Sequence, residues 1–167
     1  MELHLHSHHL THRRPDWAAA AASGFAAGAL LMMLELFWSA IIQDANPWVT
    51  SHRIAALALG PEVLKSGDFS TGIVGVALII HYALGIAFGL VLAAVMAPFH
   101  FDSSAGTALI VGAVFGLLLY LVNFFVMTSA FPWFAEMRGL PTLTAHLIFG
   151  ASAALIYMKL ERPEFAR

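Results

Sequence analysis

Four long runs of apolar residues, separated by short polar segments, set the pattern of this chain. The runs cover residues 17–43, 72–97, 105–131 and 141–159. Each run reaches or nearly reaches the length of about 20 residues that an α-helix needs to cross the hydrocarbon core of a membrane. Backbone polar groups in lipid must find their partners within the chain, so each run is expected to be helical. The pattern therefore predicts an all-α fold, a four-helix bundle in which every helix crosses a membrane.

Two polar tails flank the predicted membrane domain, which covers residues 17–160. The N-terminal tail, residues 1–16, lacks the apolar core and the small-residue cleavage site of a signal peptide. More basic residues lie on the side of the membrane that holds the two tails than on the opposite side. The tail side has Arg13, Arg14, Lys159, Arg162 and Arg167, and the loops on the opposite side have Arg53, Lys65 and Arg138. The positive-inside rule then predicts that residues 1–16 and 161–167 both face the cytoplasm. We expect a multi-pass protein of a bacterial inner membrane, surrounded by the lipid bilayer.

The segment between the first two runs, residues 49–69, is too short and too charged to cross a membrane. We expect a short helix over residues 50–59 that lies in the membrane interface. Gly60 and Pro61 follow this helix, and such a pair marks a turn that ends it.

The first run resembles the third, and the second run resembles the fourth. The segment GFAAGALLMMLELFW, which begins at Gly24, aligns with GAVFGLLLYLVNFFV, which begins at Gly112. Beyond each of these segments the chain repeats Pro-Trp-x4-Arg. The second and fourth runs share His-x3-Gly, at His81 and His146. The pattern predicts two tandem copies of a helix–loop–helix unit, related by a pseudo-two-fold axis along the membrane normal.

The same segments resemble a known group of proteins. The runs GAVFGLLLYLVNFFVMTSAFPWFA and TAHLIFGASAALIY, together with LELFWSAI, NPW and HYALGIAFGLVLA, are similar to an uncharacterised family of small bacterial four-span membrane proteins. The resemblance covers roughly residues 17–160. Some members carry the label "sodium:proline symporter", which looks misassigned because four spans are too few for a sodium–solute symporter core. The resemblance implies a four-span membrane fold and no particular chemistry.

Each predicted span carries one polar residue at a similar depth. Glu35 is the only charged residue deep within a run, and His81, Asn123 and His146 occupy comparable positions in the other three. Glycine residues lie on the same helical face as each of them, at spacings of four or seven, and small residues let membrane helices approach closely. We expect the four polar side chains to meet inside the bundle. An ionisable residue in a membrane costs about 2.5 kcal/mol or more at the helix centre, so the cluster is a candidate functional site.

Several interpretations of this cluster are open. Glu35, His81 and His146 offer the two imidazoles and one carboxylate that bind zinc or iron in many proteins, with Asn123 as a weaker ligand. The cluster could instead relay a proton or bind a small solute. His81 and His146 lie on diagonal helices at like depth, so a less favoured interpretation is a bis-histidine haem b. The alternative without a ligand is a hydrogen-bonded cluster that fixes the register of the helices.

Two further groups of residues have both a functional and an ordinary interpretation. The tail holds five histidines that could form a weak metal site or simply be solvated: His4, His6, His8, His9 and His12. The Pro-Trp-x4-Arg elements supply Trp48, Arg53, Trp133 and Arg138, which are typical of membrane-interface anchors. Arg53 and Arg138 could otherwise contact an anion at the mouth of the site.

The amino-acid composition excludes several classes of protein. Apolar residues make up 60% of the chain and charged residues 11%, and its mean hydropathy of +0.80 excludes a soluble or disordered protein. The formal net charge of −2 argues against nucleic acid as a partner, and the absence of cysteine excludes disulfides and thiolate metal sites. No nucleophile–base arrangement or phosphate loop is present, so we expect no enzyme.

The sequence therefore predicts an integral membrane protein that binds or carries a proton, a metal ion or a small solute. A non-catalytic accessory or assembly subunit of a larger membrane complex is the alternative. Because four helices leave little room for a pore, a transport function would favour a homodimer.

Overall fold

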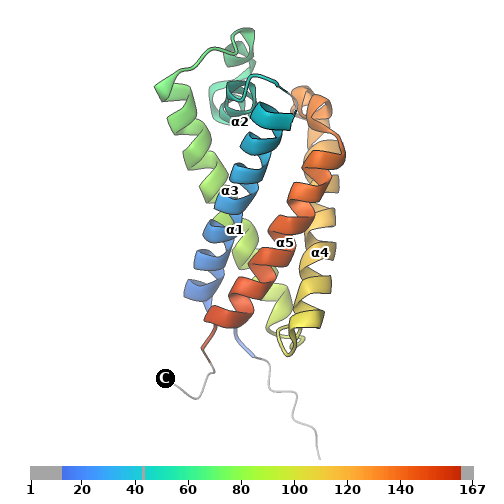
Figure 1. Ribbon diagram of the computed structural model, residues 1–167. Coiled ribbons are helices and arrows are strands. Elements are labelled where there is room, and N and C mark those ends of the chain that lie inside the picture. The colour runs from blue at the N-terminus through green and yellow to red at the C-terminus, as the bar shows by residue number, and fades with distance from the viewer. Residues whose placement is uncertain (1–12, 43, 163–167) are drawn as a thin grey trace, which may run out of the picture.

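The computed structural model of the protein describes residues 13–42 and 44–162, and these residues form helices joined by short connections. The helices are α1 (Trp17–Phe37), α2 (Trp48–Leu59), α3 (Thr71–Met96), α4 (Ala105–Leu121) and α5 (Leu140–Leu160). No strand occurs within the described residues, so the predicted all-α fold is confirmed. Figure 1 shows α1, α3, α4 and α5 side by side as an elongated bundle, with α2 at one end. We call the end of the bundle that carries α2 the α2 end, and the opposite end, where α1 begins and α5 ends, the terminal end.

Four helical stretches are long and apolar enough to cross a membrane. They are Trp17–Ile42, Thr71–Met96, Ala105–Ser129 and Leu140–Leu160. Their ends lie within two residues of the predicted spans. Large apolar side chains on the outside of the bundle are exposed, as expected of a surface that faces lipid; examples are Met33, Ile79 and Ile110. The fold is therefore that of a multi-pass membrane protein.

Side chains at the helix ends explain where three of the spans begin. Asp16, Ser70 and Ser104 precede α1, α3 and α4, and each side chain accepts a hydrogen bond from the backbone N–H three residues further on. Such caps satisfy N–H groups that the first helical turn leaves without partners. As predicted, α2 ends at Gly60, whose φ of 84° is a conformation that glycine adopts readily.

Glycine residues let the helix backbones touch in two pairs. A side chain at Gly24 of α1 would collide with the carbonyl oxygen of Gly85 in α3. In the same way, a side chain at Gly112 of α4 would collide with the carbonyl oxygen of Gly150 in α5. These two contacts occupy corresponding positions in the predicted repeat. The remaining contacts are unequal, because α1 packs along α5 whereas α3 and α4 meet only briefly.

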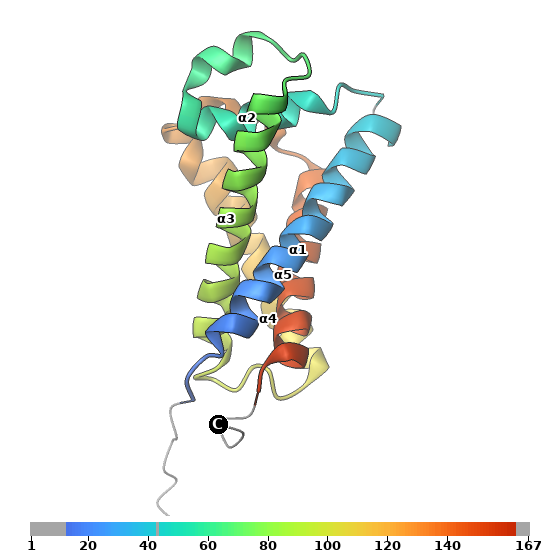
Figure 2. The same cartoon turned by 90° about the vertical axis from the view of Figure 1, so that its left-hand side faces the viewer.

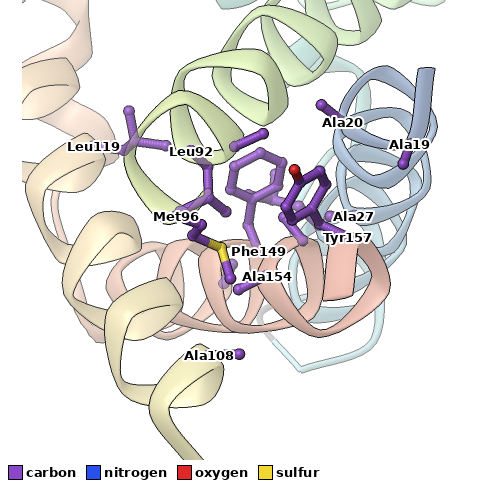
Figure 3. Close-up of a cluster of buried hydrophobic side chains, with 14 residues drawn as sticks. Ala19, Ala20, Ala27, Leu92, Met96, Ala108, Leu119, Phe149, Ala154 and Tyr157 are labelled. Atoms are coloured by element: carbon purple, nitrogen blue, oxygen red, sulfur yellow. The ribbon is translucent and has the colours of Figure 1, made fainter. Parts of the chain in front are cut away.

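The hydrophobic core fills the terminal half of the bundle. Leu92 and Met96 of α3 meet Phe149 and Tyr157 of α5, and alanine residues of α1 complete the cluster. Figure 3 shows these side chains converging between the helices. Dense apolar packing closes this half, so any cavity within the bundle must lie toward the α2 end.

Candidate functional site

A cavity of about 130 Å³ lies in the α2 half of the bundle. It is lined by Glu35 from α1, His81 from α3, Asn123 from the turn after α4 and His146 from α5. The rest of its wall is mostly apolar and includes Leu31, Phe88, Leu119, Phe124 and Phe149. The structure thus brings together around one cavity the four polar residues that the sequence singled out.

A π-helical turn, Val122–Val126, carries Asn123 at the end of α4. Such turns shift the register of the side chains beyond them and are frequent at functional sites. Arg138 stabilises the turn, because its Nε donates a hydrogen bond to the carbonyl oxygen of Phe124 at 2.6 Å. The Arg138 guanidinium also lies 4.4 Å from the centre of the Phe125 ring. Arg138 therefore supports the wall that holds Asn123.

Hydrogen bonds set the ring orientation of both histidines. In His81, Nε2 donates to the carbonyl oxygen of Gly28 at 2.8 Å, and in His146, Nδ1 donates to the carbonyl oxygen of Thr142 at 2.8 Å. A carbonyl oxygen only accepts, so these nitrogens carry the hydrogen. The other nitrogen of each neutral ring is then an acceptor. For His146 this nitrogen, Nε2, lies 3.5 Å from the Asn123 amide nitrogen, which makes a long contact.

The Glu35 carboxyl group lies where three hollows meet. Besides the central cavity it lines a second cavity toward Trp48 and a large groove between α1 and α5. Among the described residues, no side chain or backbone group forms a hydrogen bond or ion pair with it. An unpaired carboxyl group in a membrane is costly, which makes Glu35 the strongest single indication of a ligand.

The geometry gives no support to a metal or haem site. Within the described residues no three His, Cys, Asp or Glu side chains are arranged to hold a metal ion. Nε2 of His81 is turned toward α1, and a cavity of about 130 Å³ is far too small for a porphyrin. The tail histidines His4, His6, His8, His9 and His12 lie outside the described residues.

The other predicted interface residues join the loops at the α2 end. The indole nitrogen of Trp133 donates to the carbonyl oxygen of Arg53 at 3.0 Å, and the Arg53 guanidinium pairs with Glu136 at 2.6 Å. Trp48 packs against the ring of Phe69. These contacts tie α2 to the segment before α5, so the two Pro-Trp-x4-Arg elements hold the loops above the cavity together.

Sequence reasoning missed His52, which is buried in α2. Its Nδ1 lies 2.6 Å from the carbonyl oxygen of Val63 and its Nε2 lies 2.9 Å from that of Asp68. Both ring nitrogens therefore connect α2 to the segment that leads to α3. A lone histidine in a polar segment gives no sequence signal for such a role.

A polar cluster at the terminal end was also missed. Arg13 pairs with Asp102 at 3.0 Å and with Glu161 at 2.7 Å, joining the segment before α1 and the residue after α5 to the loop between α3 and α4. Burial raises the pKa of Glu161, the hydrogen bond from Arg13 opposes this rise, and the nearby Asp102 adds to it. The one available signal was that Asp102 is the only acidic residue between the second and third apolar runs.

Comparisons with protein-family models, curated proteins and solved structures give no match. The family resemblance stays a prediction, and the function has to be argued from the site. Together the fold and the site define a helical membrane protein whose mostly apolar internal cavity holds four polar side chains.

Proposed function

We propose that the protein binds a small lipid-soluble molecule, with a ring-sized apolar body and a hydrogen-bond-donating group, in the cavity beneath α2. The observation that carries this proposal is that Glu35, His81, Asn123 and His146 line one cavity whose other walls are apolar. Mostly apolar walls with a few converging polar groups are typical of small-molecule sites. With both termini in the cytoplasm, as the charge pattern predicts, the cavity lies in the outer half of the membrane.

The size of the cavity favours a single ring. An engineered apolar protein cavity of about 150 Å³ binds benzene. The present cavity of about 130 Å³ is close to that value. A benzene-sized body therefore fits, whereas larger fused systems would require the helices to move.

The polar groups favour a ligand that donates hydrogen bonds. Nε2 of His146 and the remaining nitrogen of His81 are acceptors when the rings are neutral. The oxygens of Glu35 are acceptors when the group is ionised. A hydroxyl or amino group would satisfy them, whereas a purely apolar ligand would leave buried polar atoms unpaired, at a cost of about 1–3 kcal/mol each.

The alternatives have less support. A transmembrane proton relay needs a chain of polar groups or water. Between the cavity and the Arg13 cluster the bundle is instead filled by apolar side chains such as Leu92, Met96 and Phe149. The interpretations as an accessory subunit of a larger complex or as a homodimer have no particular contact among the described residues in their favour.

Fluorine NMR of the protein in lipid nanodiscs tests the proposal with two matched probes. 4-Fluorophenol carries an O–H donor, and 4-fluoroanisole replaces that hydrogen with a methyl group. We expect a saturable shift with 4-fluorophenol, and binding of 4-fluoroanisole that is about tenfold weaker, as the loss of about 1.4 kcal/mol would give. Equal shifts for both probes, or shifts no larger than in empty nanodiscs, would contradict the proposal.

A pair of variants locates the site. His146→Asn replaces the imidazole, with its Nε2 acceptor, by a shorter side chain, and His100→Asn makes the same change at an exposed position on the loop between α3 and α4. His100 has a φ of 55°, a conformation that asparagine tolerates. Only His146→Asn should weaken 4-fluorophenol binding, with thermal unfolding used to check that both variants fold. If both variants bind like the unaltered protein, the cavity is not the site.

A further inference from the structure

A second and larger hollow lies beside the cavity, between the α2-end halves of α1 and α5. This α1–α5 groove has a volume of about 830 Å³. Figure 2 shows the α2-end half of α1 leaning away from the rest of the bundle, which opens the groove. Glycine and alanine contacts hold α1 against its neighbours only nearer the terminal end.

Part of the groove lies at the level of the membrane. Two spanning helices supply that part of its wall, with Leu34 and Phe37 on α1 and Ile148 on α5, and α2 and the segment before α5 supply the rest. Arg53 and Glu136 line its edge next to α2, where they form an ion pair. The groove is therefore mostly apolar between the spanning helices, with Ser39 and Thr144 among its polar residues, and charged next to α2, which matches a lipid-like molecule with a polar head.

The groove and the central cavity share part of their walls. Glu35 and Met137 line both hollows. Because Glu35 lines both hollows, its carboxyl group stands between the lipid-facing groove and the central cavity; it is only partly exposed and has no partner among the described residues. A molecule in the groove meets this carboxyl group before it meets the histidines.

We infer that the ligand is a ring-headed lipid, which reaches the site sideways from the membrane. Its hydroxylated or amino-substituted ring occupies the cavity, and its alkyl or isoprenoid chain lies in the α1–α5 groove. The inference rests on the proposed function and adds the class of ligand and its route. The chain gains little from leaving lipid, which is as apolar as the groove, so the groove acts by giving the chain room while the ring is bound.

A displacement experiment separates the ring from the chain. 4-Hexylphenol, which has the same head as 4-fluorophenol and a six-carbon chain, is added to protein that holds 4-fluorophenol, and release is followed by fluorine NMR. We expect displacement in the unaltered protein. A closed, ring-sized cavity would admit 4-fluorophenol and exclude 4-hexylphenol, so absence of displacement would overturn the inference.

A matched pair of substitutions tests the groove. Ser39 lines it, whereas the adjacent Ala40 is exposed and lines neither the groove nor the cavity. In Ser39→Trp the indole fills the groove, so 4-fluorophenol should still bind while at least tenfold more 4-hexylphenol is needed to displace it. Ala40→Trp should behave like the unaltered protein. Thr144→Trp blocks the groove from the α5 side and replaces Ser39→Trp if that variant does not fold.

The outcomes distinguish the two proposals. If 4-fluorophenol binds and 4-hexylphenol displaces it equally well from Ser39→Trp and Ala40→Trp, the proposed function stands and the groove inference is wrong. If 4-fluorophenol does not bind, but the proton NMR signals of 4-hexylphenol itself show saturable binding that Ser39→Trp weakens, the groove is a lipid site and the proposed ring site is wrong. If neither probe binds, both proposals fall.

Discussion

Nε2 of His81 donates a hydrogen bond to the carbonyl oxygen of Gly28, 2.8 Å away on the neighbouring helix. Gly28 has no side chain to cover its carbonyl oxygen, and one built there would lie 3.6 Å from the same nitrogen. The pair joins α1 to α3 at the wall of the cavity. This hydrogen bond also determines which nitrogen of the His81 ring can accept a hydrogen bond from a ligand.

Replacement of His81 should therefore affect stability and binding differently. His81→Leu removes the interhelical bond and should lower the free energy of unfolding by about 1 kcal/mol, the range measured for such bonds in membrane proteins. His81→Gln keeps an N–H donor, so its free energy of unfolding should fall by less. Thermal unfolding in detergent compares the two variants. Equal stability of His81→Leu and the unaltered protein would mean that the bond does not hold the helices together.

The glycine contacts predict a strong dependence on position. Gly112→Ala places a methyl group against the backbone of α5 and should cost about 1–3 kcal/mol, the usual effect of overpacking. Gly75→Ala changes an equally helical position with open space around it, and should be neutral or stabilise the helix by about 0.5–1 kcal/mol. Thermal unfolding of both variants measures the difference. Similar melting temperatures would argue against direct backbone packing of α4 on α5.

The terminal cluster predicts a pH dependence that one substitution removes. Because burial raises the pKa of Glu161, the folded protein binds more protons than the unfolded chain between the ordinary glutamate pKa, about 4.3, and the raised value. This contribution stabilises the fold at low pH and is lost as the pH rises through that window. Glu161→Gln cannot ionise, so its melting temperature should match that of the unaltered protein at low pH, exceed it increasingly as the pH rises through the window, and stay higher by a constant amount above it. A constant difference at all pH values would contradict this account.

Arg13 should matter more than either of its partners alone. Arg13→Gln leaves the nearly inaccessible Asp102 carboxylate without its counter-ion, and breaking a buried ion pair from one side costs about 3–5 kcal/mol. A second change, Asp102→Asn, removes the orphaned charge and should restore part of the loss. Unfolding of the two single variants and the double variant gives the coupling. Additive effects would show that Arg13 and Asp102 act independently.

The sequence was sufficient for the parts of the structure that local pattern controls. The length and apolarity of the runs define the spans, and spacing within one helix places Glu35 and its glycines on one face. Because small residues mark the faces that meet, Glu35, His81, Asn123 and His146 could be expected inside the bundle, and they line one cavity.

The remaining features depend on how distant segments meet. Arg13 and Asp102 are 89 residues apart, and His52 bonds to carbonyl groups that any residue could present. The α1–α5 groove follows from the tilt of a whole helix. The predicted repeat implies that α1 contacts α5 as extensively as α4 contacts α3. The weak contact between α3 and α4, against the extensive one between α1 and α5, could not be inferred from similar runs of apolar residues.

The most direct test of the central claim is to locate a bound ring. Crystals of the protein soaked with 4-bromophenol would reveal the bromine by its anomalous scattering. The account predicts a bromine peak inside the bundle near Leu31 and Phe149, with the phenol oxygen within hydrogen-bond distance of Glu35 or His146, and loss of the peak in His146→Asn. Bromine found only on the lipid-facing surface, with an empty cavity, would contradict it.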